Sequence, residues 1–160
     1  MKVYNMIFPI WFLLFFPPVI FITLIGNFVI DSLVIVACFF IFHLSNQKME
    51  LKTFYKRSFL KVWLFGFLAD IIGAAILFLV SMFANNELSS AISYDPFSSP
   101  LAVTIIIFAM LVSSAFIFIL NYRFSFKELV SEKALRIKIS LAIAIITIPW
   151  TFLIPTKWFF

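Results

Sequence analysis

The sequence predicts an all-α fold, a polytopic transmembrane helix bundle of four to five spans forming one integral membrane domain over residues 1–160. Hydrophobic residues make up 64% of the chain and charged residues 12%, against roughly 45–50% and 25% in an ordinary soluble domain. The apolar residues also form blocks long enough for a crossing helix, which needs about 20 residues. No Asp, Glu, Lys or Arg occurs between Lys2 and Asp31, between Asp95 and Arg123, or between Lys138 and Lys157.

Five apolar segments are expected, at about residues 7–25, 28–42, 62–83, 101–122 and 139–154. The last three are typical spans, and Pro149 is expected to bend the final one. Gly26 and Asn27 alone separate the first two segments, and this turn signal favours a tight helical hairpin with five crossings. Pro17 and Pro18 remove two backbone donors from the first segment, which is therefore expected to be kinked, re-entrant or interfacial. The count of crossings stays at four or five.

The distribution of basic residues predicts the orientation. Loops 44–61 and 123–138 contain ten Lys and Arg residues between them, whereas loop 84–100 contains none. Because short cytoplasmic loops carry the excess of Lys and Arg, the two basic loops are expected in the cytoplasm and loop 84–100 outside the cell membrane. Four tryptophans lie toward segment ends, as interfacial anchors do: Trp11, Trp63, Trp150 and Trp158.

Both basic loops have a helical pattern of their own. Lys48, Lys52 and Lys56 recur every fourth residue, followed by Arg57, as in a basic helix that lies on anionic lipid headgroups. In the second loop, the spacing of Ser125 and Glu128 is that of a capping box, and it predicts a short helix through Leu129 and Leu135. A solvated loop with positive-inside charge explains either stretch as well.

Two carboxylates, Asp31 and Asp70, lie inside the apolar segments. An ionisable residue at membrane depth costs about 2.5–3.5 kcal/mol on insertion scales, so it is by default a hypothesis of function. Gly66, Asp70 and Gly73 follow the spacing that places residues on one helix face, and glycines let a second helix approach closely. Asp70 is therefore expected to point into the bundle.

Other polar or small residues repeat the same spacing on neighbouring segments. Asn27 shares a face with Asp31, and Ser140, Ala144 and Thr147 share a face of the final span, together with Thr151. Ser140 and Ala144 are interpreted as helix-packing positions, and Asn27 and Thr147 as polar partners of the carboxylates. At 1.5 Å per residue, Asp70 lies roughly 12 Å and Asp31 roughly 20 Å from the cytoplasmic ends of their predicted spans. The sequence therefore does not predict that the two carboxylates meet.

Two hypotheses of function follow. In the first, the protein is a cation- or proton-linked channel, transporter or subunit, with Asp70 and Asp31, helped by Asn27 and Thr147, binding the charge inside the bundle. Asp70 serves equally well in a structural role, hydrogen-bonded between helices. In the alternative, the chain is a non-catalytic accessory, immunity or assembly protein that binds a larger membrane partner. The partners expected are the lipid bilayer and either further copies of the chain or a membrane complex.

An enzyme is not indicated, and no catalytic residue, cofactor or metal site is predicted. Asp70 and Tyr94-Asp95 lack the Gly-x-Gly-Asp element of intramembrane aspartyl proteases, and Asp95 falls in the external loop. The chain has one histidine, His43, and one cysteine, Cys38, and neither a phosphate-binding glycine loop nor a nucleophile elbow. The net charge of +5 resides in the connections between spans, so no nucleic-acid partner is expected.

Overall fold

The structure is a computed structural model that describes residues 9–14, 19–47 and 49–159. Its long helices are α2 (Val19–Ile41), α3 (Leu51–Phe83), α5 (Pro100–Leu120) and α6 (Lys133–Ile146). The shorter elements are α1 (Ile10–Leu13), η1 (Leu44–Gln47), α4 (Asn86–Ser93), η2 (Pro96–Ser98), η3 (Asn121–Ser125), η4 (Trp150–Leu153) and η5 (Thr156–Trp158). No strand occurs in the described ranges. Four helical segments are long and apolar enough to cross a membrane, the last one continuing from α6 to Leu153. The prediction of an all-α, multi-pass membrane protein is confirmed.

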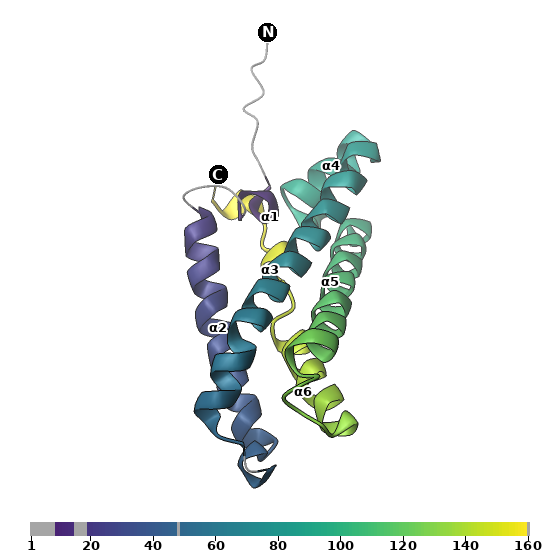
Figure 1. Ribbon diagram of the computed structural model, residues 1–160. Helices are drawn as coiled ribbons and strands as arrows, with labels where there is room; N and C mark the ends of the chain where they lie inside the picture. Colours follow the sequence, from purple (N-terminus) through teal and green to yellow (C-terminus); the bar gives the residue numbers. More distant parts are fainter. Residues whose placement is uncertain (1–8, 15–18, 48, 160) are drawn as a thin grey trace.

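The four long helices form a bundle in which α3 packs against α2 and α5, and α5 packs against α6 (Figure 1). We call the end that carries the connections 42–50 and 126–132 the basic end, and the opposite end, where α4 lies, the α4 end. The α2 and α3 helices lie together near the basic end and diverge toward the α4 end (Figure 1). The short helix α1 and the chain after α6 lie in the opening between them (Figure 1).

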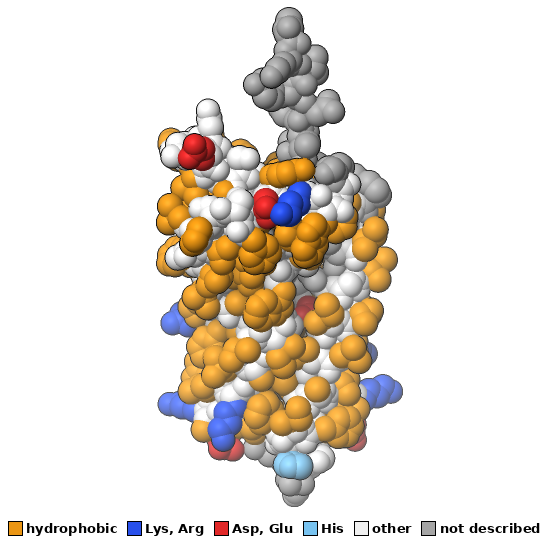
Figure 2. Space-filling model, turned by 180° about the vertical axis from the view of Figure 1, so that it is seen from behind, with side chains coloured by type: hydrophobic (Ala, Val, Ile, Leu, Met, Phe, Trp, Pro, Cys, Tyr) orange, Lys and Arg blue, Asp and Glu red, His pale blue; other side chains and the backbone are white. Residues whose placement is uncertain are grey.

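The outer surface between the two ends is a belt of hydrophobic side chains (Figure 2). Large apolar residues on every long helix are more than half exposed, including Phe21, Leu64, Phe108 and Ile145. Lys and Arg side chains gather toward the basic end (Figure 2). An apolar belt of this kind would be costly in water, but it matches the hydrocarbon core of a bilayer.

The expected helical hairpin at Gly26 and Asn27 is wrong, because both residues lie inside the continuous helix α2. A turn at membrane depth would leave backbone N–H and C=O groups without hydrogen-bond partners. This cost outweighs the local turn preference of Gly26 and Asn27, so the helix continues through them. The first predicted segment, residues 7–25, is divided between the four-residue helix α1 and the first turns of α2, which begins at Val19. Pro17 and Pro18, which were expected to kink or break this segment, lie outside the described residues. The described chain has four crossing helices.

The short helix α1 is anchored at the α4 end by contacts far apart in sequence. Trp11 is 2% exposed, and its indole Nε1–H donates to the carbonyl of Ile92 at 3.2 Å. Thr156 Oγ1 donates to the carbonyl of Ser93 at 2.8 Å and accepts the backbone N–H of Ile10 at 2.9 Å. Trp11 is therefore a buried packing residue, and the prediction that it is an interfacial anchor is wrong.

Of the other tryptophans, Trp150 and Trp158 are mostly exposed. Trp63 is half-buried in α3 and donates from Nε1 to the carbonyl of Leu24 in α2 at 3.1 Å. It therefore ties two helices together within the span.

The predicted loop 44–61 is for the most part helix, because α3 begins at Leu51. Lys52, Lys56 and Arg57 are exposed on the first turns of α3 while Phe54 is buried, which is the amphipathic pattern expected of a helix at a headgroup layer. Contact with lipid headgroups stays a prediction for these residues. Lys48, the fourth residue of the set, lies outside the described residues.

The predicted capping box in loop 123–138 is wrong. Ser125 Oγ donates to Asn121 Oδ1 at 2.6 Å inside the π-helical turn η3, and α6 begins only at Lys133. The α5 helix continues into η3, so the side chain that was expected to start one helix instead closes the end of the preceding one.

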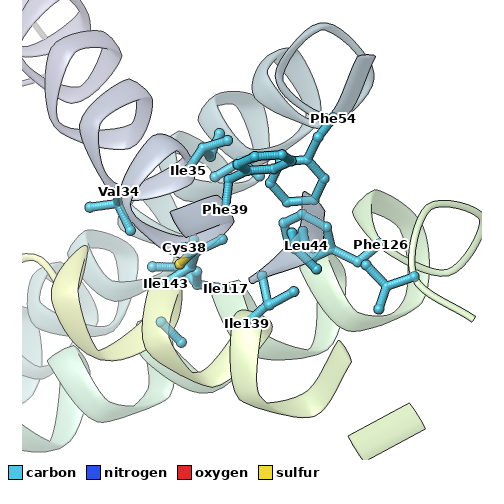
Figure 3. Close-up of a cluster of buried hydrophobic side chains, with 14 residues drawn as sticks. Val34, Ile35, Cys38, Phe39, Leu44, Phe54, Ile117, Phe126, Ile139 and Ile143 are labelled. Carbon is cyan, nitrogen blue, oxygen red and sulfur yellow. The ribbon is translucent and has the colours of Figure 1, made fainter. Parts of the chain in front are cut away.

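Two hydrophobic clusters fill the interior. The basic-half cluster joins α2, η1, α3, α5, the connection 126–132 and α6 around Phe39, Phe54, Ile117, Phe126 and Ile139 (Figure 3). The α4-half cluster joins α1, α3, α4, α5 and η4 around Trp11, Leu77, Ile92, Ile106 and Phe152. The candidate functional site lies beside the second cluster, between α2 and the chain that follows α6.

Candidate functional site

The glycines of α3 bring this helix close to its neighbours on the predicted face. A Cβ at Gly66 would lie 3.7 Å from Asp31 Oδ2 of α2. A Cβ at Gly73 would overlap Ser113 Oγ of α5 and lie 2.8 Å from Phe152 Cε2. The face that carries Asp70 between these two glycines is therefore turned toward the bundle, where α2 and η4 meet α3.

A cavity of about 260 Å³ lies between α2, α3 and the chain from Ile146 to Phe152. Both carboxylates line it, Asp31 from α2 and Asp70 from α3. The other polar side chains in its wall are Thr23, Asn27, Thr147 and Thr151, and its aromatic side chains are Phe67, Trp150 and Phe152. Acidic side-chain atoms are visible within the apolar belt of the surface (Figure 2).

The two carboxylates have more acceptor oxygens than the described residues around them satisfy. Asp31 is only 4% exposed and takes part in no hydrogen bond or ion pair within the described chain. Asp70 Oδ2 accepts from Asn27 Nδ2 at 3.5 Å, but Asp70 Oδ1 is buried and has no partner among the described residues. None of the described residues that line the cavity carries a positive charge. The site is thus an acceptor-rich pocket that lacks a counter-charge from these residues.

The third wall of the cavity is a break in the last span. The α6 helix ends at Ile146, and the N–H of Thr147 makes the last helical bond, to Ile143. Pro149 has no N–H, so it cannot donate to the carbonyl of Ile145 as a helical residue would. The N–H of Trp150 donates to the carbonyl of Ile148 and not to that of Ile146, which an α-helix would require. Pro149 was expected to bend this span, and it ends the α-helix.

Irregular backbone at membrane depth is tolerated where it is buried in protein or lines a polar cavity. Residues Ile146 to Phe152 all line the cavity. The break therefore adds backbone carbonyls and two threonine hydroxyls to the surroundings of Asp31 and Asp70. Thr147 Oγ1 itself donates to Ile143 at 2.9 Å, which leaves its lone pairs to accept.

The structure brings together the four residues for which ion or proton binding was predicted: Asp70, Asp31, Asn27 and Thr147. The expected depths were measured from a span that begins near residue 62, but α3 begins at Leu51, and α2 packs along it with Asp31 opposite Gly66 and Asn27 opposite Asp70. The two carboxylates therefore lie about one helical turn apart in the same cavity. Their binding role stays a prediction. Of the packing positions, Gly66 forms part of the cavity wall, and Gly73 lies against α5.

Ser140 and Ala144 do not line the cavity but are buried in α6. The carbonyl of Ala144 accepts from Ser114 Oγ of α5 at 2.8 Å, a direct link between the two helices. Ser140 Oγ is buried and has no hydrogen-bond partner in the described chain.

Two kinds of cavity residue were not singled out from the sequence. Thr23 lies four residues before Asn27 and eight before Asp31, so its place on the same face of α2 was available from spacing alone. Thr23 Oγ1 lies 2.9 Å from the carbonyl of Ile20 and 3.0 Å from that of Leu14, which joins α2 to the end of α1. Phe67 and Phe152 carry no sequence signal that separates them from the many other phenylalanines.

No protein-family model, curated protein or solved structure matches this chain. The assignment of function therefore rests on the geometry of the cavity.

Proposed function

We propose that this protein moves protons or cations across a membrane, with Asp70 and Asp31 holding the transported charge in the cavity between α2, α3 and the broken end of α6. The observation that carries the proposal is the pairing of two carboxylates in one cavity, with unsatisfied acceptor oxygens and no positive side chain among the described lining residues. Asp70 Oδ2 does link α3 to Asn27 of α2, but a carboxyl that only tied helices together would have both oxygens hydrogen-bonded, whereas Asp70 Oδ1 has no partner among the described residues.

The chemistry of the cavity suits one positive charge. Removal from water disfavours the charged form of a carboxyl, and two carboxylates in one cavity repel each other, so a bound proton or cation relieves both costs. Asn27 Nδ2 holds Asp70 Oδ2, leaving Asp70 Oδ1 for the transported charge. Freed carbonyls and half-helix ends are the groups with which transporters coordinate cations at membrane depth.

The proposal includes an orientation. Lys and Arg are concentrated in the connections and helix turns at the basic end, whereas residues 84–100 have none, which supports a cytoplasmic basic end in a cell membrane. The cavity extends from Asp31 toward Leu14 and Thr23 at the α4 end. Charge would then reach the carboxylates from the outer half of the membrane and leave past the basic-half cluster when the bundle rearranges.

Proton and cation flux in proteoliposomes tests the proposal. Asp70→Asn keeps the size of the side chain and the bond partner of Asn27 but removes the charge, so flux is expected to fall to the level of empty liposomes. Asp31→Asn is expected to reduce flux strongly as well. Glu87→Gln is the matched control, because Glu87 is an exposed carboxylate on α4 away from the cavity.

Wild-type flux in Asp70→Asn protein that remains folded would remove Asp70 from the mechanism. If purified wild-type protein conducts nothing, but a larger membrane protein is recovered with it from native membranes, the accessory role replaces transport. Cross-linking in native membranes, followed by identification of the bound chains, separates a homo-oligomer from a subunit of a larger complex.

A further inference from the structure

We infer that the cavity receives the charged head of a lipophilic organic cation whose apolar body lies in a groove between α1, α2 and α3. The inference deepens the proposed function, on which it rests, by naming the class of cation carried. It depends on a second hollow next to the carboxylates, on the wall that the two hollows share, and on the aromatic lining of the cavity.

The groove has a volume of about 440 Å³ and is lined by Phe, Ile and Ala side chains alone among the described residues. Ile20 of α2 forms one side, and Ile71 and Ala75 of α3 form the other. Ile71 is 42% exposed and Phe78 is 46% exposed, so the groove opens on the outer, lipid-facing surface. Its lining residues belong to α1, α2 and α3, and Figure 1 shows that α2 and α3 diverge toward the α4 end.

The groove and the cavity share one wall residue, Phe67. Asp70 lines the cavity and the next residue, Ile71, lines the groove. A rotation of the Phe67 side chain would join the two hollows, and it would give a molecule dissolved in the lipid a lateral route to the carboxylates. The combined site is acidic at one end and apolar at the other.

Size and lining favour an organic cation over a metal ion. A small inorganic cation is held by several oxygen ligands at about 2.0–2.6 Å, which does not call for a 260 Å³ cavity with Phe67, Trp150 and Phe152 in its wall. That volume is near the lower end of small-molecule sites, about 300–1,000 Å³. Aromatic faces attract organic ammonium and related cations, most strongly away from water. The charge of the ligand follows from Asp31 and Asp70.

A fluorescent N-methyl styrylpyridinium dye is a suitable probe, because it has a cationic ring at one end of an apolar body. Its binding is measured on purified protein in lipid nanodiscs, with the signal of empty nanodiscs subtracted. We expect saturable binding to the wild type and at least 10-fold weaker binding of the uncharged styrylpyridine that lacks the methyl group. Asp70→Asn is expected to weaken dye binding about 100-fold, which is within the range for truncating one partner of a buried charge pair in a complex, and Glu87→Gln is expected to leave dye binding unchanged.

The groove is tested separately by Ala75→Phe, which adds a ring at an exposed position that lines the groove. Leu79→Phe, one turn further along α3 and also exposed, is the matched control outside the groove. Ala75→Phe is expected to weaken dye binding about 10-fold, whereas Leu79→Phe is expected to leave dye binding unchanged.

The outcomes separate this inference from the proposed function. If wild-type protein conducts protons or small cations but binds the dye no better than empty nanodiscs do, the inference is overturned and the proposed function stands. Dye binding that depends on Asp70, in protein that conducts nothing, supports the inference and removes transport. Equal binding of the charged and uncharged probes identifies the hollows as a lipid-filled surface and overturns the inference. Asp31→Asn replaces Asp70→Asn in every arm if the latter does not fold.

Discussion

The two halves of the bundle are built from the same helices but are packed differently. In the basic half, α2, α3 and α6 close around a core in which Phe54 lies 5.7 Å from Phe126 and 5.9 Å from Phe39, measured between ring centroids (Figure 3). In the α4 half, α2 diverges from α3 (Figure 1) and α6 has ended, and residues of α2, α3 and the chain from Ile146 to Phe152 line the acidic cavity. The α4-half cluster is built from α1, α3, α4, α5 and η4 without a buried residue of α2, and the polar site lies on the side that α2 faces.

Buried polar groups without a partner occur in both halves, but they differ in kind. In the basic half, Asn121 Nδ2 donates to the carbonyl of Ile117 at 2.9 Å, and Ser58 Oγ donates to that of Phe54 at 2.8 Å. Among the described residues, the unpaired buried atoms are Ser140 Oγ and Arg136 Nε in the basic half, and Ser81 Oγ, Asp95 Oδ1 and Asp70 Oδ1 toward the α4 end. Asp70 Oδ1 belongs to a carboxylate inside a crossing helix, which is the costliest of these positions to leave without a partner. The difference teaches that the α4 half carries this cost at its cavity.

The largest stability effect is expected from Phe54→Ala in the basic half. Phe54 is fully buried between Phe39 and Phe126, so truncation leaves a void and should lower the free energy of unfolding by about 3–5 kcal/mol. Unfolding in mixed micelles measures the loss. Phe21→Ala is the control, because Phe21 is 61% exposed on α2 and its loss should cost far less. Equal losses in the two variants would mean that the basic-half cluster is not the stable core.

A smaller loss, about 1–3 kcal/mol, is expected from Gly73→Ala. The added methyl group would overlap Ser113 Oγ and press on Phe152, so α5 or η4 must shift. Gly66→Ala is the matched control, because its methyl group would meet Asp31 Oδ2 at the ordinary contact distance of 3.7 Å. In thermal unfolding in detergent, Gly73→Ala should have a lower melting temperature than Gly66→Ala. The reverse order would contradict the close approach of α3 to α5.

Much of this architecture could be predicted from the sequence, because hydropathy and spacing are local signals. Apolar blocks predict the long helices, which the structure confirms. The Gly66, Asp70, Gly73 spacing predicts a helix face turned to its neighbours, and in the structure Gly66 lies opposite Asp31 of α2 and Gly73 lies against Ser113 of α5. The expected break at Gly26 and Asn27 failed for a physical reason: in lipid the cost of unpaired backbone groups outweighs a local turn preference.

The cavity itself could not be predicted, because it depends on contacts between distant parts of the chain. Asp31 and Asp70 share it through the packing of α2 on α3, and the starting point of α3 at Leu51 is set by an amphipathic turn that hydropathy alone assigns to a loop. The anchoring of α1 by Thr156, 146 residues away from Ile10, has no local signature at all.

The smallest stability effect, with a clear functional one, is expected from Pro149→Ala. Alanine supplies the N–H that the carbonyl of Ile145 lacks, so α6 should extend past Ile146 and draw Thr147 and Trp150 into the helix. The gain of roughly 3 kcal/mol from removing a helix-interior proline would be largely offset as Phe152 leaves its buried position, a loss of similar size.

We therefore expect Pro149→Ala to leave the free energy of unfolding almost unchanged. It should nevertheless lower cation or proton flux several-fold, because the cavity wall opposite Asp31 and Asp70 changes shape. Thermal unfolding and proteoliposome flux, measured on one preparation, check both parts. Pro100→Ala is the control, since Pro100 occupies the first position of α5, where proline costs a helix nothing. Full flux in a Pro149→Ala protein whose last span is continuous would mean that the broken helix plays no part in the site, and that the contrast between the two halves reflects packing alone.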